Sequence, residues 1–315
     1  MAIEQSFVKL FIRLMNEYNI QGNLLTLGVQ DVVATHEEMG DVLRECKYDI
    51  DDVKPEYRKY ASSVRANQAR FIFGKQWMHQ EDLFLKMFKF SSLQSLDVFD
   101  SEHPDIIHDL NNPIPECFYN KFDVIIDIGV LEHVFDIRQA VENIVSMLKK
   151  DGVLIHSTPL ADYDENKCFY YLQPAFYWDV YSANGFGDMK TYIEWMPKYR
   201  FGQSNVKCIY REYKYNDNVR FSKPLHIAST IFVARKNNEV ENFAVPIQNY
   251  YQALHSRANS LNEIPEVPQV IMNLFIKFPV AKPIVVFFWK MLPVSFCGLL
   301  FGLFHRQENR EEISL

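Results

Sequence analysis

The chain has 315 residues, of which 48% are hydrophobic, and it carries a formal net charge of -7. This length and composition suit one large folded core or two smaller ones and exclude a disordered chain. The acidic balance disfavours nucleic acid as a partner, because phosphate binding needs a concentrated basic face, although a local one is not excluded. Five scattered cysteines show neither zinc-ligand nor disulfide spacing, so we expect a reducing, cytoplasmic compartment.

Residues 1–21 predict an amphipathic helix that packs on the domain that follows. The segment lacks the continuous apolar run and the cleavage site of a secretory signal. A membrane anchor is the less favoured alternative. The apolar side chains recur at helical spacing, as Phe7, Leu10, Phe11 and Leu14.

Short apolar runs flanked by Pro, Asn and Gly predict strands buried on both faces, as in a parallel sheet with helical crossovers. The runs lie at 22–28, 95–100, 105–108, 122–127 and 153–156. Sheets of this kind bind ligands beyond the carboxyl ends of their strands. Polar residues at these ends are therefore candidate ligand contacts.

Helices are expected at 80–88 and at 137–149, and Gly152 is expected to adopt the left-handed conformation that ends the second helix. Two later apolar runs, 205–210 and 229–235, predict strands that close the sheet as an edge hairpin. Together these elements predict a doubly wound α/β domain.

We expect this domain to cover residues 22–238. Its first two strands lie about 65 residues apart, far more than one crossover helix needs, which predicts an inserted segment at 31–76. Between positions 54 and 75 this insert has six cations against one acid, Glu56. The basic stretch is either a solvated helix face, which is favoured, or a lid over an anionic acceptor or a membrane surface.

Residues 239–269 are polar and turn-rich and are expected to form a linker, followed by an apolar extension at 270–315. Within it, 283–304 carries one charge, Lys290, and meets the length rule for a membrane span. A proline interrupts this stretch, and a lysine within a span costs about 2.5 to 3.5 kcal/mol at the centre. Peripheral contact with the inner face of a membrane through 270–304 is favoured, and a buried helical hairpin and a true span are the alternatives.

The acids at the strand ends and the glycine turn at Gly28 predict a nucleotide-type pocket. An acid at the end of the second strand can accept hydrogen bonds from both ribose hydroxyls. Asp97 is the candidate for this role. Asp100 is the less favoured choice because it lies further into the loop.

Several segments together resemble the class I S-adenosylmethionine-dependent methyltransferases. The resemblance covers positions 22 to 186, over half of the chain. More narrowly, the segments resemble a bacterial subgroup marked by HDLN-x-PIP and D-x-G-x-LEHVF. It implies a Rossmann-like fold with a mainly parallel, seven-stranded sheet and S-adenosyl-L-methionine as cofactor. The segments are LTLG, LDVFD, HDLNNPIP, FDVIIDIGVLEHVFD, LKKDGVLIHSTP and FYYLQPAFYWDVYSANGF.

Carried over by position, the resemblance implies seven cofactor-binding residues: Gly28, Gln30, Asp97, Asp109, Leu110, Asp127 and Gly129. Gly28 would lie beside the methionine part of the cofactor, and Gln30 belongs to the same turn. The third residue would bind the ribose, the next two would contact the adenine, and the last two would line the sulfonium end. The chain departs from the usual glycine-rich turn of the family, E/D-x-G-x-G-x-G. Two of its close-approach glycines are missing here.

Methyl transfer from a sulfonium needs mainly positioning of the acceptor, about 3 to 3.5 Å away. For a hydroxyl or ammonium acceptor, a general base would add about 10²- to 10⁴-fold. His133, which follows Glu132, is the first candidate for this base because its ordinary pKa is near neutral. The alternative is a structural, hydrogen-bonded histidine, and His108 and His156 are weaker candidates. No metal is expected, because Gly129 replaces the first acid of the Glu-x-x-Glu-His pattern with which some related methyltransferases bind one.

Aromatic residues crowd positions 169 to 178, where acceptor-binding segments of this fold usually lie. They predict either a hydrophobic plug over the sheet, which is favoured, or the floor of a site for a sugar or a lipid-linked acceptor.

The function predicted from these features is methyl transfer (EC 2.1.1.-) by in-line displacement to a small molecule or to a cell-envelope glycan or lipid intermediate. A catalytically silent cofactor-binding or scaffold protein with the same fold is the alternative. A nicotinamide-dependent oxidoreductase is less favoured, because no G-x-G-x-x-G follows the first strand. The acceptor and the oligomeric state are not predicted.

Overall fold

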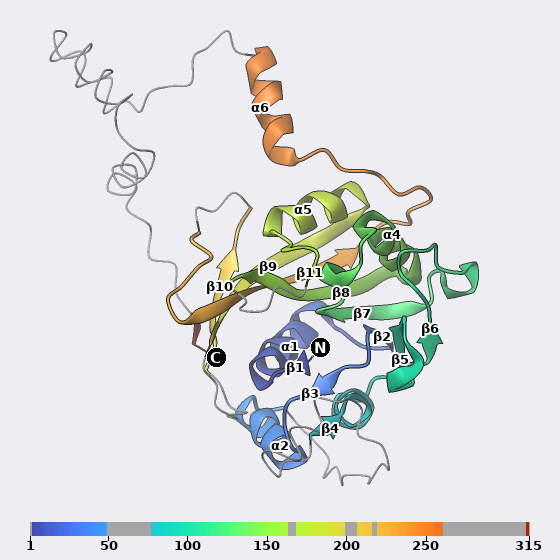
Figure 1. Cartoon of the computed structure of the whole chain (residues 1–315), viewed down its shortest axis with the longest axis vertical. Coiled ribbons are helices and arrows are strands. Elements are labelled where there is room, and N and C mark those ends of the chain that lie inside the picture. The colour runs from blue at the N-terminus through green and yellow to red at the C-terminus, as the bar shows by residue number, and fades with distance from the viewer. Residues whose placement is uncertain are drawn as a thin grey trace, which may run out of the picture. The chain divides into compact units, whose positions relative to one another are not determined.

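Figure 1 shows a computed structural model of the chain. The larger of its two units comprises residues 1–246 with 312–315, and the smaller comprises 247–311 and contains α6, Asn249–Ser260. None of the described helices is long and apolar enough to cross a membrane. The stretches 54–75 and 283–304 lie outside the described residues, so the expectations for them stay predictions. The structure describes residues 2–48, 77–162, 168–198, 207–215, 219–260 and 313–314.

Among the described residues, the main sheet has nine strands in the order β12-β10-β9-β11-β8-β7-β2-β5-β6. The pairings among β6, β5, β2, β7 and β8 are parallel, and every pairing beyond β8 is antiparallel. The fold is therefore Rossmann-like α/β, but its sheet is mixed and has more strands than the seven expected. The strands are β2 Asn23–Leu27, β5 Ser92–Asp97, β6 Ile106–Ile107, β7 Phe122–Ile128, β8 Leu148–Ala161, β9 Phe186–Pro197, β10 Ile209–Tyr213, β11 His226–Lys236 and β12 Ile313–Ser314.

A second, small sheet follows the carboxyl end of β2. It joins β1 (Ala2–Ile3), β3 (Asp31–Val32) and β4 (Met78–His79) in the order β1-β3-β4. The sheet ties the start of the chain to both ends of the insert. The sequence pattern did not predict it, because two-residue strands are too short to show a periodicity.

The central strands are buried on both faces, as their continuous apolar runs predict. In β7, Val124 and Ile126 belong to one hydrophobic cluster, whereas Ile125 belongs to another. The same alternation continues in β8, where Ile155 faces the first cluster and Leu154 the second. Side chains alternate between the faces of a strand, so each face needs its own cover of helices.

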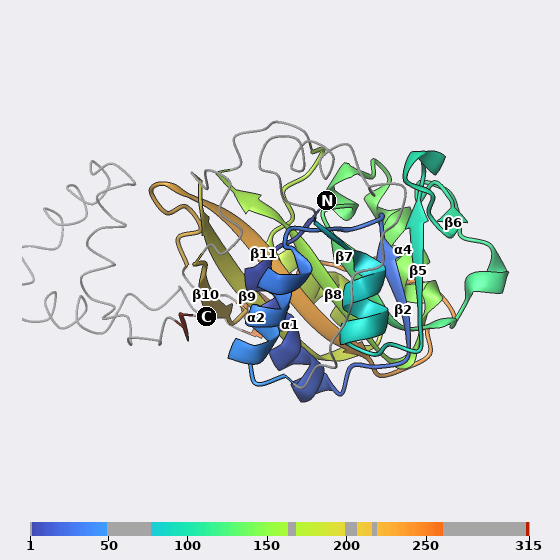
Figure 2. The same ribbon diagram turned by 90° about the horizontal axis from the view of Figure 1, so that it is seen from below.

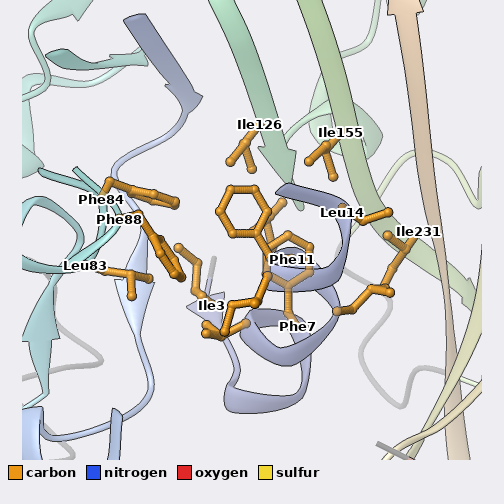
Figure 3. Close-up of a cluster of buried hydrophobic side chains, with 14 of the residues drawn as sticks. Ile3, Phe7, Phe11, Leu14, Leu83, Phe84, Phe88, Ile126, Ile155 and Ile231 are labelled. Atoms are coloured by element: carbon orange, nitrogen blue, oxygen red, sulfur yellow. The ribbon is translucent and has the colours of Figure 1, made fainter. Parts of the chain in front are cut away.

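Helix α1 (Gln5–Tyr18) covers one face of the sheet, and its apolar stripe is buried as expected for an amphipathic helix packed on the domain. Figure 2 views the molecule from the side of α1, and Figure 3 shows Phe7, Phe11 and Leu14 turned toward isoleucines of the sheet. The ring of Phe11 lies 6.0 Å from that of Phe84 and 5.3 Å from that of Phe88, measured between centroids. These two rings come from the segment around η1 (Asp82–Met87), a π-helical turn instead of the α-helix expected at 80–88.

Helices α4 (Ile137–Met147) and α5 (Pro174–Ala183) pack against the other face. Tyr177 and Tyr181 of α5 are fully buried and stack on Phe232 of β11, with ring centroids 5.2 and 5.5 Å apart. The second half of the aromatic segment is therefore a helix that plugs this face of the sheet. In the first half, Phe169 and Tyr171 are exposed, whereas Tyr170 packs partly buried against the core.

Two local expectations were wrong. The predicted edge hairpin does not form, because β9 lies between β10 and β11, and β11 is an internal strand next to β8. Gly152 is not left-handed; Asp151 takes that conformation, with φ 64°. A side chain at Gly152 would instead approach the Lys149 carbonyl oxygen to 2.8 Å and the Asp123 carbonyl oxygen to 3.0 Å, so that crowding explains this glycine.

The described part of the insert, 31–48, is ordered by local hydrogen bonds. Helix α2 (His36–Glu45) begins with a capping box, in which the Glu38 N–H donates to the Thr35 hydroxyl at 3.2 Å and the Thr35 N–H donates to the Glu38 carboxylate at 2.9 Å. Its buried residues join the cluster under α1.

Candidate functional site

The carboxyl ends of β6, β5, β2 and β7 meet at one rim of the sheet. Leu27, the last residue of β2, is in register with Leu96 of β5 on one side and with Asp127 of β7 on the other. Gly28 continues from Leu27 with φ 72°, and its N–H donates to the Leu96 carbonyl at 2.7 Å. The glycine turn is therefore flanked by the ends of the strands that carry Asp97 and Asp127.

Asp97 ends β5 and is partly exposed at this rim. One of its carboxylate oxygens, Oδ1, accepts a hydrogen bond from the Phe99 N–H at 3.1 Å. The bond holds the side chain at the turn, and its partial exposure leaves the carboxylate accessible to a ligand. Asp100, the second choice for a ribose ligand, is exposed further along the loop.

Asp109 follows β6 and forms a turn within its own loop. Its Oδ1 accepts hydrogen bonds from the Asn111 N–H at 2.9 Å and from Asn111 Nδ2 at 2.7 Å. These bonds, the backbone one first, lower the pKa of the Asp109 carboxyl below its ordinary value. The next residue, Leu110, has its side chain buried in the core, so that only its backbone and its chain neighbours reach the rim.

Asn143 of α4 holds this loop in place through hydrogen bonds. It was not predicted as a site residue. Its Nδ2 donates to the carbonyls of Leu110 at 3.1 Å and Asn112 at 2.8 Å, and its Oδ1 accepts from the Ile114 N–H at 2.9 Å. A polar residue on the buried stripe of an otherwise apolar helix is the sequence signal that could have identified it. The loop that would receive the adenine is thus held by a side chain about 30 residues away.

Gln30 lies in the turn after Gly28, but its side chain is fully buried. Its Nε2 donates to the Leu27 carbonyl at 2.6 Å, and its N–H donates to Gln80 Oε1 at 3.1 Å. Thr26 also donates to Gln80 Oε1, at 3.2 Å. Gln30 therefore shapes the turn from inside, and direct contact with a cofactor stays a prediction.

The turn after β7 is built on Asp127, which is fully buried. Its Oδ1 accepts hydrogen bonds from the N–H groups of Val130 at 3.0 Å and Leu131 at 3.3 Å. Its Oδ2 pairs with His156 Nδ1 at 2.7 Å. Gly129, with φ 76°, donates its N–H to the Ser157 carbonyl at 3.0 Å, so that the turn is also fixed to β8.

Glu132 and His133 lie together in the short helix that ends this turn, η4 (Leu131–His133). Glu132 is only 1% exposed, and burial, followed by the charge of Asp127, raises its pKa to about 8. Its Oε2 has no hydrogen-bond partner among the described residues. The side chain of His133 is 49% exposed, and its Nε2 lies 3.9 Å from Glu132 Oε1.

This arrangement places a carboxyl group that can hold or release a proton near neutral pH at the carboxyl end of a central strand. Groups with strongly shifted pKa values often act in catalysis. The two predicted catalytic residues are adjacent, and the pKa of Glu132 is strongly raised. Their roles in a reaction stay predictions.

The two weaker histidine candidates make internal hydrogen bonds. His156 is fully buried, with Nδ1 paired to Asp127 and Nε2 to the Tyr181 hydroxyl at 2.6 Å. His108 Nε2 donates to the Asn112 carbonyl at 3.1 Å. No group of three or more potential metal ligands occurs in the part of the chain that the structure describes.

The polar groups at this rim are of the kind that an adenosyl cofactor needs, and they follow adjoining strand ends. Asp97 offers a partly exposed carboxylate on one side of the glycine, where ribose hydroxyls could donate to it. On the other side, Gly129 and Glu132 belong to the turn after β7, and Glu132 Oε2 is buried without a hydrogen-bond partner among the described residues. Parallel sheets bind nucleotides in this place, beyond the carboxyl ends of the strands.

Comparisons with known proteins identify the domain. Residues 43–194 match the family described as Methyltransferase domain, a range that contains the turns after β5, β6 and β7 and follows the Gly28 turn. No curated protein matches the chain. The chain spans about half the length of the CurJ carbon methyltransferase structure, with 14% identity, 75% of this chain and 54% of that chain covered, and a TM-score of 0.35.

Two smaller solved structures match over nearly their whole length. The YcgJ protein from Bacillus subtilis is 13% identical, with 73% of this chain and 99% of that chain covered and a TM-score of 0.36. A possible histamine N-methyltransferase from Thermotoga maritima is 13% identical, with 74% and 97% covered and a TM-score of 0.33. Identities and TM-scores this low carry no information about the acceptor.

The matched family implies S-adenosyl-L-methionine as the methyl donor. Residues 43–194 therefore belong to a methyltransferase domain with the class I S-adenosylmethionine-dependent fold.

Proposed function

We propose that the protein transfers the methyl group of S-adenosylmethionine to a small molecule or to a cell-envelope glycan or lipid intermediate. In this proposal Glu132 and His133 accept the proton that the acceptor loses. The observation that carries this proposal is the buried carboxyl of Glu132 in the turn after β7, whose pKa burial and the charge of Asp127 raise to about 8 and whose Oε2 has no hydrogen-bond partner among the described residues. In the in-line step, the acceptor atom forms the new bond to the methyl carbon. The electron pair of the broken bond stays on sulfur, and the acceptor proton passes to the base.

The surface beside Glu132 supports an acceptor with an apolar or planar part. Phe135 and Phe169 are 70% and 63% exposed, and their rings pack edge to face with centroids 5.7 Å apart. The Phe169 N–H donates to the Glu132 carbonyl at 2.9 Å, which joins this pair to the turn. Exposed aromatic rings next to a buried polar group are typical of sites for amphipathic ligands. They favour the interpretation that this half of the aromatic segment forms the floor of a site for a sugar or a lipid-linked acceptor.

Peripheral contact of residues 270–304 with an anionic membrane is part of the same proposal, because a lipid-linked acceptor would lie there. Co-sedimentation of the full chain with anionic vesicles tests this contact. Protein that remains in the supernatant at low salt excludes it.

Calorimetry with S-adenosylmethionine tests the cofactor assignment. Asp97→Ala is expected to weaken binding at least about tenfold, because one charged hydrogen-bond acceptor of the ribose is lost. Asp100→Ala is the matched control and is expected to bind as the wild-type chain does. Absence of binding to the wild-type chain at millimolar cofactor would remove the proposal, and equal loss in both variants would contradict the ribose assignment.

The acceptor-side role is tested by turnover on an identified acceptor. Glu132→Gln is expected to reduce turnover by about 10²- to 10⁴-fold with little change in cofactor affinity. If Glu132→Gln and His133→Ala both turn over normally, neither residue is the base. Cofactor binding without turnover on any acceptor tried would favour the silent binding protein.

A further inference from the structure

A buried chain of hydrogen bonds connects the turn after β7 to helix α5. It runs from Asp127 Oδ2 to His156 Nδ1 at 2.7 Å and from His156 Nε2 to the Tyr181 hydroxyl at 2.6 Å. The three residues belong to β7, β8 and α5, and their side chains are fully buried. These hydrogen bonds therefore lie inside the domain, and they occupy both ring nitrogens of His156.

One assignment of protons gives each donor in this series of hydrogen bonds an acceptor. Burial, followed by the charge of Asp127, raises the pKa of Tyr181 well above its ordinary value, so that Tyr181 keeps its proton. Its hydroxyl can then donate to His156 Nε2. A neutral imidazole with its proton on Nδ1 donates in turn to the Asp127 carboxylate.

The other oxygen of Asp127 forms the turn itself. It receives the N–H groups of Val130 and Leu131, which lie between Gly129 and Glu132. Because both oxygens belong to one rigid carboxylate, the orientation set by His156 on one side fixes the positions of the two N–H groups on the other. The charge of Asp127 also contributes to the raised pKa of Glu132.

Packing alone does not explain such a network. Replacing a buried polar pair by apolar side chains of similar volume is often neutral or stabilising, so a core seldom needs one for stability. Fully satisfied buried networks do fix a single local geometry. The turn that this network fixes is the one that carries Gly129 and Glu132.

We propose that His156 and Tyr181 are positioning residues, which act through Asp127 to hold the Gly129–Glu132 turn in the geometry that receives the sulfonium end of S-adenosylmethionine. The inference rests on the proposed assignment of Asp127 and Gly129 to that end of the cofactor. His156 thereby has a role other than that of a base.

The chain offers a matched control for Tyr181. Tyr177 lies one turn earlier on α5, is also fully buried, and also stacks on Phe232. The ring centroids of Tyr177 and Tyr181 lie 5.0 and 5.5 Å from that of His156. The Tyr177 hydroxyl, however, is bonded to Thr158 at 2.7 Å and not to His156. The change of either tyrosine to phenylalanine removes one buried hydrogen bond. Only the bond of Tyr181 is connected to Asp127, through His156.

The test compares the affinity for S-adenosylmethionine by calorimetry with the free energy of unfolding in urea for Tyr181→Phe and Tyr177→Phe. Both variants are expected to lose similar stability. Tyr181→Phe should bind the cofactor about tenfold more weakly, the effect of about one hydrogen bond, whereas Tyr177→Phe should stay within about twofold. The NMR signal of the His156 Nδ1 proton should shift in Tyr181→Phe and not in Tyr177→Phe.

A second pair of variants keeps the inference testable if Tyr181→Phe does not fold. His156→Asn retains a donor near the Nδ1 position and is expected to bind within about threefold of the wild type, whereas His156→Leu should lose at least about tenfold. If the two variants of each pair bind the cofactor with equal affinity, and the wild-type chain still binds it, this inference is overturned and the proposed function is not. Failure of the wild-type chain to bind the cofactor would overturn the proposed function and this assignment together.

Discussion

The two halves of the rim are built in opposite ways. After β5 and β6, Asp97 and Asp109 are partly exposed and accept hydrogen bonds from groups two or three residues further along the chain. After β7, Asp127 is fully buried and depends on His156, 29 residues away, which in turn depends on Tyr181, 25 residues further on. An exposed carboxylate stays charged without help, whereas a buried one requires partners from elsewhere in the fold.

The proton affinities of the two halves differ in the same way. Hydrogen bonds from Asn111 lower the pKa of Asp109, whereas burial and the charge of Asp127 raise that of Glu132 to about 8. Asp109, in the half after β5 and β6, is therefore charged at neutral pH. Glu132, in the half after β7, can still hold a proton there.

The largest effect that separates the halves is expected from removal of their central carboxylates. Asp127→Ala should lower the free energy of unfolding by about 3 kcal/mol or more, because it leaves buried donors on His156 and on the turn without an acceptor. Asp109→Ala, at the exposed half, should cost no more than about 1 kcal/mol. Urea denaturation measures both values, and similar losses would show that the two halves are not different in kind.

A second effect, which is spread over several pH units, concerns the pKa of Glu132. Its folded pKa of about 8 lies above the unfolded value of about 4.3, so its contribution to stability is fully present below pH 4.3 and is lost as the pH rises toward 8. The free energy of unfolding of the wild type should fall by up to about 1.4 kcal/mol per pH unit in this window relative to Glu132→Gln. Denaturation curves from pH 5 to 9 check the difference, and parallel curves would contradict the raised pKa.

The smallest effect is expected at Asp109, whose contribution to stability depends on pH with the opposite sign to that of Glu132. Its folded pKa is lowered, so its contribution to stability is present above its unfolded pKa and is lost as the pH falls through the folded value. The stability difference between the wild type and Asp109→Asn should therefore shrink below about pH 4. Acid titration of both proteins checks this, and a difference that grows toward acid would reverse the assignment.

Some of the fold could be predicted because neighbouring residues determine it. The apolar runs predict the parallel strands β2, β5, β7 and β8, and helical spacing predicts α1 and α4. The antiparallel end of the sheet could not be predicted in the same way. Strand β9 contains buried polar residues, Thr191 and Glu194, which hide its strand pattern, and without β9 the strands β10 and β11 look like a hairpin.

The sequence by itself determined the acids at the strand ends, the glycine turn and the family to which they belong, because turns and strand ends depend on residues close together in the chain. Only the tertiary structure decided that Gln30 and His156 are buried, that Asn143 clamps the loop after β6, and that Asp127 is connected to Tyr181. The physical reason is distance along the chain. Partners some 25 to 30 residues apart meet only when the strands are ordered and the helices are packed, and burial, which sets the pKa of Glu132, is a property of that packing.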